Sequence, residues 1–389
     1  LRDNKLTVSS YRKSTKRITE LTPSRTQENT LREFHEEIRD KDNSTLGAQK
    51  LLIVLVNFQN NNSEPATKEE VYNRVLNAHN PESTNSQILE MSYNKAFLVG
   101  NVKGWYTLTI DQNNACTNLE AMYEKGANLV DPDVDFRKYE KIMFVFPKTN
   151  NCNFGGLARF GAKTFGTSEG DVTLKVTAIN SPDYIDKGVA THELGHNFGL
   201  DHAHYYKCPN QYVTSECTDR RYNGASYDDI YDSMGVALGK GHFNIFHKLK
   251  LSWLSSSNLI INPVSGIYKI EKIENPSDEL KGIIIQTSSG TNYSIEYRRP
   301  YGSDLTTYQA YSSYNPDIFE GALIHIDKLL TTSSRSDTQI IDPTPEESAN
   351  PNLDVFLKKN QTFTDPINKI RITTIDFDDN YLTINLERF

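Results

Sequence analysis

Four residues between positions 192 and 202 have the types and the spacing of a catalytic metal centre. His192 and His196 are four residues apart, so on a helix both imidazoles lie on one face and can reach the same cation. Glu193 lies beside them as a candidate base. A third imidazole, His202, reaches that cation only if the chain turns back, and Gly199 supplies the permissive backbone for the turn. Three neutral nitrogens leave one tetrahedral position open for water, as in catalytic zinc sites.

The alternative explanation is chance, because a histidine pair at this spacing occurs in many unrelated helices without a metal. The additional Gly199 and His202 at fixed offsets make chance a poor explanation. We therefore predict zinc as the cofactor, with His192, His196 and His202 as its ligands and Glu193 as the catalytic residue.

The pattern His-Glu-x-x-His-x-x-Gly-x-x-His, with Met234 in a Tyr-Asp-Ser-Met-Gly string further along, resembles the signature of the metzincin metallopeptidases. Within that family, the Asp-x-Met-Gly form and residues 247–254 resemble the gametolysin-type branch most closely. The resemblance covers about residues 50–255. It is looser beyond them, where an Ile-Glu-Tyr-Arg string at residues 295–298 is also similar.

The resemblance implies a role for one methionine and for one of two tyrosines. Met234 would form the structural Met-turn, an apolar floor beneath the histidines, which is physically equivalent to ordinary core packing. Tyr227 and Tyr231 are candidate donors to a transition-state oxyanion. In the family, that donor usually lies two residues after the methionine of the turn, where this chain has Val236.

The function that follows is that of a secreted zinc-dependent endopeptidase acting on a protein or peptide substrate. Glu193 would deprotonate the water that attacks the scissile carbonyl and then pass the proton to the leaving amine. Two alternatives remain. One is a surface-binding, adhesin-like protein with a structural or vestigial zinc site, which would not need a base such as Glu193. The other is a hydrolase acting on a non-protein amide.

Composition divides the 389 residues into three parts. Residues 1–48 are charged and poor in apolar positions, which predicts a solvated arm or a propeptide remnant. Residues 49–255 form the predicted metzincin-like catalytic domain, an α+β unit with a mixed twisted sheet and an active-site helix. Residues 256–389 show short alternating strands without a long helical period, so we expect an all-β, sandwich-like domain there.

The pattern of apolar residues predicts the individual elements. In the first domain we expect strands at residues 50–58, 105–110 and 141–147, and helices at 67–78, 86–98, 119–129, 183–197 and 244–253. In the second we expect strands at residues 266–273, 282–287, 293–297, 322–326, 370–376 and 381–386. The family resemblance implies an edge strand that binds substrate by main-chain pairing. Either 153–162 or 171–178 would supply it.

Charge and hydropathy exclude several partners. The net charge is −8 and no basic patch offsets it, so nucleic acid is not expected as a partner. No apolar run reaches membrane-spanning length. Calcium is possible but unsupported: residues 131–135 carry spaced aspartates, but Phe136 and Ile142 replace the glycine and glutamate that an EF-hand loop needs. No pattern predicts an oligomeric state.

The four cysteines, Cys116, Cys152, Cys208 and Cys217, allow two disulfides in three pairings. We prefer Cys208 with Cys217, across a short loop, and Cys116 with Cys152. Four reduced thiols in a cytosolic protein are the alternative. Because the chain begins at Leu1 rather than methionine, we expect that a secretion signal has been removed and that the protein is extracellular.

Overall fold

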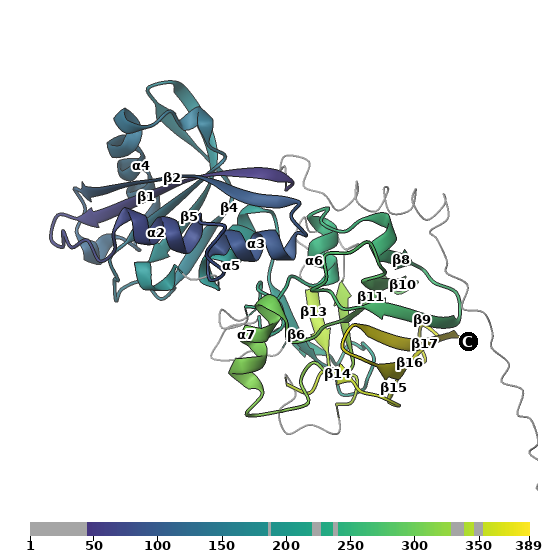
Figure 1. Ribbon diagram of the computed structural model, residues 1–389. Coiled ribbons are helices and arrows are strands. Elements are labelled where there is room, and N and C mark those ends of the chain that lie inside the picture. The colour runs from purple at the N-terminus through teal and green to yellow at the C-terminus, as the bar shows by residue number, and fades with distance from the viewer. Residues whose placement is uncertain (1–44, 186–187, 220–226, 236–239, 328–337, 346–352) are drawn as a thin grey trace, which may run out of the picture.

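The computed structural model describes residues 45–185, 188–219, 227–235, 240–327, 338–345 and 353–389. These residues form a mixed α+β region followed by a largely β region, which confirms the predicted fold class (Figure 1). Of the predicted N-terminal arm, only residues 45–48 belong to the described part, and strand β1 begins within them at Gly47.

The first region is built on a five-stranded sheet in the order β2-β1-β3-β5-β4. Four strands are parallel, and β4 lies antiparallel to β5 at one edge. The strands are β1 (Gly47–Phe58), β2 (Ala96–Leu108), β3 (Lys141–Phe146), β4 (Gly156–Thr167) and β5 (Gly170–Asn180). The helices are α2 (Lys68–Val75), α3 (Thr84–Met91), α4 (Leu119–Val130) and α5 (Val189–Asn197), with 3-10 turns at Gln112–Asn114, Asp131–Asp133, Phe136–Lys138 and Pro182–Tyr184.

Strand β1 is an interior strand of this sheet, between β2 and β3. Its side chains are apolar on both faces, which suits a strand covered on both sides. Every side chain from Leu51 to Val56 is fully buried. Alternate residues contribute to two different cores, one on each side of the sheet. Helices α2, α3 and α5 pack into the core on one side and α4 into the core on the other (Figure 1). The helix with two of the predicted ligands is thus anchored on the sheet.

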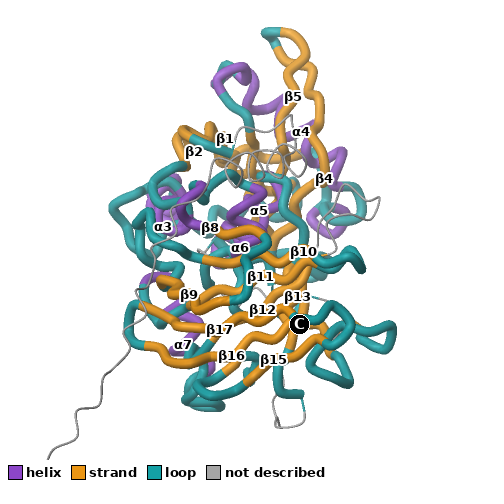
Figure 2. Tube along the Cα trace, turned by 90° about the vertical axis from the view of Figure 1, so that its right-hand side faces the viewer, coloured by secondary structure: helices purple, strands orange, loops and turns teal. Residues whose placement is uncertain are grey.

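The second region contains two sheets, with strand orders β7-β6-β13-β12-β11-β10-β8 and β15-β16-β17-β9. Isoleucines and leucines from both sheets form one apolar core between them, and Figure 2 shows the strands of the smaller sheet beside those of the larger. Its elements, with those of the connecting segment, are β6 (Ala203–Lys207), β7 (Thr218–Asp219), α6 (Ile245–Lys250), a 3-10 turn (Ser256–Asn258), β8 (Leu259–Ile261), β9 (Gly266–Glu271), β10 (Gly282–Gln286), β11 (Asn292–Tyr297), α7 (Gly302–Tyr311), β12 (Ala322–Asp327), β13 (Thr338–Ile341), β14 (Phe356–Leu357), β15 (Thr362–Asp365), β16 (Ile370–Phe377) and β17 (Tyr381–Arg388).

The larger sheet includes chain from both sides of the boundary predicted at residue 255. Strand β6 pairs in parallel with β13, so that Ala203 lies opposite Thr338. The Thr338 N–H also donates to the carbonyl oxygen of His202, at 3.3 Å. The segment that follows the third predicted ligand is therefore held by the C-terminal sheet.

Buried polar contacts also join the two regions. Arg298, on the second region, is fully buried and donates to the carbonyl oxygens of His242, at 3.0 Å, and of Tyr231. On α3, the Glu90 carboxylate lies 2.8 Å from His242 Nε2 and accepts the Ser303 N–H at 2.7 Å. These contacts fix α3 of the first region against the start of α7 in the second.

Several predicted elements differ in their bounds from the structure, and one helix was not predicted. The helix expected at 86–98 ends at Met91, because Tyr93 and Asn94 have left-handed φ values of 55° and 61°, and β2 follows. Helix α5 begins at Val189 rather than near residue 183, where a 3-10 turn stands instead. Helix α7 was not expected, since its serine and threonines are weak helix formers; tertiary contacts at Ser303 and Asp304 hold its first turn.

The preferred cysteine pairing is confirmed. Cys116 is bonded to Cys152 and Cys208 to Cys217. Both bridges are consistent with an oxidising, extracellular environment. Within the described residues, no helix is long and apolar enough to cross a membrane.

Candidate metal centre

Helix α5 ends in a turn that brings His202 back toward the helix. The Leu200 N–H donates to the Gly195 carbonyl oxygen, and the Gly199 N–H donates to that of His196, both at 3.0 Å. These two bonds form a Schellman motif, which requires a left-handed residue after the last helical turn. Gly199 supplies it with a φ of 96°. Gly199 therefore has the predicted role of reversing the chain, with a backbone conformation that a non-glycine residue adopts only under strain.

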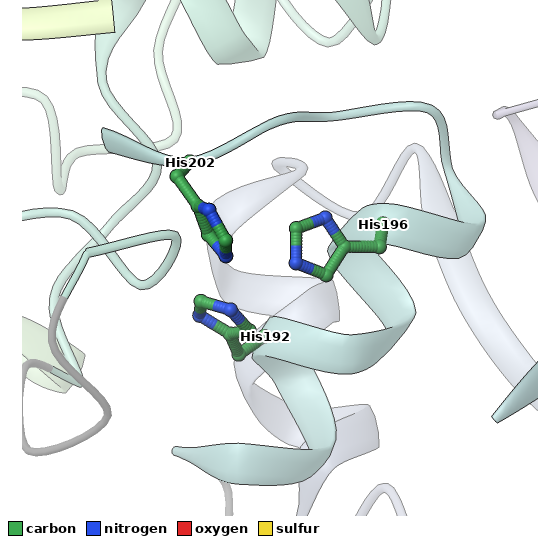
Figure 3. A group of neighbouring side chains, drawn as sticks. All are labelled: His192, His196 and His202. Atoms are coloured by element: carbon green, nitrogen blue, oxygen red, sulfur yellow. The ribbon is translucent and has the colours of Figure 1, made fainter. Parts of the chain in front are cut away.

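The three predicted ligands converge. His192 and His196 project from α5 and His202 from the returning segment, and their imidazoles face one another (Figure 3). The candidate ligand nitrogens all lie within 4.8 Å of one another. Within the described part of the chain, this is the one group of three or more His, Cys, Asp or Glu residues that could hold a metal ion.

Hydrogen bonds fix the orientation of two of these rings. Nδ1 of His192 lies 2.9 Å from the Ser233 carbonyl oxygen, and Nδ1 of His196 lies 2.9 Å from that of Leu200. A carbonyl oxygen can only accept, so each Nδ1 carries the proton and each Nε2 offers its lone pair to the centre. Burial, followed by the charges of His196 and His202, lowers the pKa of His192 to about 3, which favours its neutral, ligating form.

Glu193 is nearly buried beside the histidines. Its carboxylate accepts the N–H of Ala158 on β4, and burial raises the pKa of the Glu193 carboxyl to about 8. Gly156, at the start of β4, leaves room for this side chain, because a Cβ there would lie 2.7 Å from Oε1 of Glu193. Edge strand β4 therefore forms one wall of the site.

The predicted Met-turn packs under α5. Met234 is fully buried. Its sulfur lies so close to Gly195 of α5 that a Cβ at position 195 would overlap it, so this packing requires glycine there. The Asp232 carboxylate accepts the Met234 N–H at 2.6 Å, and the Met234 carbonyl oxygen accepts the Ala203 N–H at 3.0 Å. The turn is thereby tied to the strand that follows His202.

The structure separates the two candidate tyrosines. The ring of Tyr227 stacks on His202, with centroids 4.4 Å apart, and lies 6.0 Å from His192. Tyr231 is fully buried between Phe319 and Phe356, in the second region. Its hydroxyl donates to the Leu353 carbonyl oxygen at 3.4 Å. Tyr231 therefore does not reach the histidines, because its ring belongs to a different core. Val236 lies outside the described residues.

Two further residues at the site carry no sequence signal that we recognised. The Phe160 ring on β4 packs against His196, at 5.1 Å between centroids. Gln87, buried on α3, accepts the Thr191 hydroxyl at 2.7 Å and donates to the Ser233 hydroxyl at 3.2 Å, so it joins α5 to the Met-turn. Both contacts span long stretches of chain, which no local pattern reveals.

The aspartates at 131–135 have separate partners. Asp131 accepts the Ser168 N–H at 3.0 Å, Asp133 accepts the Tyr106 hydroxyl, and Asp135 is paired with Arg137 at 2.9 Å. Nothing in this arrangement adds support for calcium.

Comparison with known families agrees with this geometry. Residues 54–230 match the family model Reprolysin_5, described as Metallo-peptidase family M12. The chain carries an M12 metallopeptidase domain. By this domain it belongs to the zinc metalloendopeptidase class, and its three histidines are consistent with the zinc site typical of the family. No curated protein matches the chain. The match to the M12 domain includes all three histidines and Tyr227 but stops before Met234.

Proposed function

We propose that the M12 domain of this protein is an active, zinc-dependent endopeptidase that cleaves peptide bonds outside the cell. The observation that carries the proposal is the convergence of His192, His196 and His202 next to the Glu193 carboxylate, with Nδ1 of His192 and of His196 each bonded to a backbone carbonyl oxygen. A zinc ion held by these three nitrogens would act as a Lewis acid toward the scissile carbonyl and lower the pKa of water at the open position.

Glu193 is proposed as the general base. Its side chain is held on the β4 side of the site by the Ala158 N–H, and Gly156 leaves room for it. From there the carboxylate would take a proton from the attacking water and deliver it to the leaving amine. A purely structural zinc site would have no use for such a base, which argues against the adhesin-like alternative.

Strand β4 is proposed to bind the substrate backbone. It is the last strand of its sheet, so one edge of its backbone faces away from β5. It also carries the residues that contact Glu193 and His196. An extended peptide added antiparallel to this edge would pass directly over the histidines. This favours the 153–162 alternative over 171–178, because β5 lies between β3 and β4.

Tyr227 is the remaining candidate for the oxyanion donor. Its ring stacks on His202 and is half-buried. Burial, followed by the charges of Glu193 and Asp228, raises the pKa of its hydroxyl, so Tyr227 stays protonated and able to donate near neutral pH.

Within the metallopeptidases we propose kinship with the gametolysin-type branch. The support is the form of the turn, Asp232-Ser233-Met234-Gly235, together with the strings at residues 247–254 and 295–298. All three lie beyond the part of the chain that matches the M12 model.

The decisive experiment combines zinc content with cleavage of an unfolded protein, for the natural chain and for Glu193→Gln. We expect roughly one zinc per chain in both proteins. Cleavage should fall by about 10²–10⁴-fold in the variant, because the base is lost while the ligands stay. Glu64→Gln, at an exposed position, is the matched control and should cleave normally. Bound zinc without cleavage of any substrate by the natural chain would favour the adhesin-like alternative.

A further inference from the structure

A polar pocket of about 360 Å³ lies beside the start of β4, next to the proposed catalytic site. The residues lining it include Lys148, Asn150, Asn153, Gly155, Asn180 and Tyr184. The segment that connects β3 to β4 supplies most of the lining. The proposed function gives this pocket no role.

The walls of the pocket are fixed by specific bonds. Asn180, at the end of β5, accepts the Thr149 N–H at 2.7 Å and donates to the carbonyl oxygens of Thr149 and Phe154, both at 3.1 Å. The disulfide from Cys152 to Cys116 cross-links the same segment to the chain that precedes α4. The pocket is therefore built into the fold and does not depend on a loose loop.

The pocket is adjacent to the proposed base. Gly155 lines it, and the next residue, Gly156, packs against the Glu193 carboxylate. A strand advances about 3.3 Å per residue, so a peptide lying along β4 would reach the pocket within about two residues of the scissile bond. If that peptide runs antiparallel to β4, the residues that reach the pocket are those on the C-terminal side of the scissile bond.

The pocket carries Lys148, which forms no ion pair with any carboxylate in the described part of the chain. Among the described residues, no carboxylate lies within 4.0 Å of Lys148 Nζ, although the chain as a whole has a net charge of −8. This ammonium lies 5.9 Å from the centroid of the Tyr184 ring, which lines the same pocket. Asn150 and Asn153 add amide groups. Cationic and amide donors together suit a carboxylate.

We infer that this pocket binds a substrate carboxylate on the C-terminal side of the scissile bond, and that Lys148 determines this specificity. The carboxylate would come either from an aspartate or glutamate side chain or from the C-terminus of a short substrate. The inference rests on the proposed function, since it assigns a substrate preference to the same site.

The test begins with a cleavage site mapped in an unfolded protein and rebuilt as a quenched fluorogenic peptide. The second and third residues after the scissile bond are changed in turn to Glu, Gln or Lys, with the C-terminus amidated. Two shorter peptides are also made for each of these positions. Both end there, one with a free C-terminal carboxylate and the other with a C-terminal amide. We expect kcat/KM to be about three- to fivefold higher with the carboxylate, because Lys148 is exposed, and the preference to weaken in high salt.

Variants of Lys148 then assign the effect. Lys148→Gln should abolish the preference, and Lys148→Glu should reverse it in favour of the lysine peptide. Lys68→Glu makes the same charge change at an exposed site on α2 and should leave the preference intact. A second readout uses Glu193→Gln protein, in which binding of the labelled glutamate peptide, followed by fluorescence anisotropy, should weaken when Lys148→Gln is added.

The outcomes separate the possibilities. If amidated peptides with an internal glutamate are preferred, the pocket binds a side-chain carboxylate. If only peptides that end in a free acid are preferred, the pocket binds the C-terminal carboxylate. Equal cleavage of Glu, Gln and Lys peptides by the natural chain, or a preference that survives Lys148→Gln, overturns the inference while the peptidase proposal stands. If the natural chain cleaves no peptide, both fail together.

Discussion

At the scale of single residues, two tyrosines four positions apart have opposite surroundings. Tyr227 stacks on His202 and keeps part of its surface exposed, whereas Tyr231 lies in the apolar core of the second region. A phenol can stabilise a developing oxyanion only if its hydroxyl reaches the reacting carbonyl. The stacking on a ligand makes Tyr227 the residue to test.

We predict that Tyr227→Phe lowers kcat by about 10²-fold with little change in zinc content. The ring, and therefore the stacking on His202, is kept, while the hydroxyl proposed to donate to the oxyanion is lost. Steady-state kinetics with a peptide substrate and metal analysis of the same sample check this. An unchanged kcat would exclude Tyr227 as the donor.

Tyr231→Phe is the matched comparison. It removes the hydroxyl that donates to Leu353, in a buried setting, so the free energy of unfolding should fall by about 1 kcal/mol. The kcat should remain that of the natural chain, because this hydroxyl lies in a different core.

At the scale of an element, the end of α5 decides where the third ligand lies. Two of the ligands are a helical turn apart and follow from the helix alone, but His202 depends on the reversal at Gly199. The Met234 backbone holds the residue after His202, and the C-terminal sheet holds the carbonyl of His202 itself. Metal affinity is therefore expected to be sensitive to the backbone of this turn.

We predict that Gly199→Ala weakens zinc binding by at least tenfold, because a residue with a Cβ resists the φ of 96° and displaces His202. Competition with a chelator gives the affinity. Gly170→Ala is the control: Gly170 has a φ of 102° at the turn between β4 and β5, with open space around it. Both variants should lose about 1 kcal/mol of stability. Equal zinc affinities in the two would contradict the prediction.

At the scale of the whole molecule, helix α3 connects the metal centre to the C-terminal region. Gln87 contacts α5 and the Met-turn, and one turn further along Glu90 contacts His242 and Ser303. The catalytic helix and α7 of the second region are thus attached to the same helix. The stability of this attachment should depend on pH.

Burial alone would raise the pKa of Glu90, but the hydrogen bond and charge of His242, with the Ser303 N–H, outweigh it and lower the pKa from 4.5 to about 2. A pKa lowered by folding stabilises the protein above the unfolded value, and this stabilisation is lost as the pH falls through the folded value. We predict that the stability advantage of the natural chain over Glu90→Gln shrinks by roughly 2 kcal/mol between pH 4.5 and pH 2.

Urea denaturation across this pH range measures that difference. Glu64→Gln, at an exposed site, should show a pH dependence parallel to that of the natural chain. Parallel curves for Glu90→Gln as well would show that the contact with His242 does not stabilise the folded state.

The shared sheet predicts that the first region does not function alone. A chain ending at residue 255 lacks β13, the partner of β6, and leaves the segment after His202 without its main-chain bonds to the second region. We expect this fragment to bind zinc at least tenfold more weakly than the full chain and to unfold without cooperativity, as judged by chelator competition and thermal denaturation. A fragment that binds zinc and cleaves normally would instead support a domain boundary at residue 255.

The sequence by itself determined the features that depend on local spacing. The helical period places His192 and His196 on one face of α5. Glycine is one of the few residue types that readily adopt the left-handed turn at position 199, which brings the third ligand back to the helix. The unbroken apolar run of β1 and the apolar–polar alternation of the C-terminal strands are also local patterns. They made the existence and type of these elements predictable.

Tertiary structure alone decided the features that join distant parts of the chain. No local pattern indicates that β6 pairs with β13, that Gln87 bridges two parts of the site, or that Tyr231 belongs to a remote core. The same holds for α7, whose weak local propensity is overcome by contacts with Glu90 and Arg298. Spacing within one helix is fixed by backbone geometry, whereas pairing between segments depends on which arrangement buries the most apolar surface and satisfies the most polar groups.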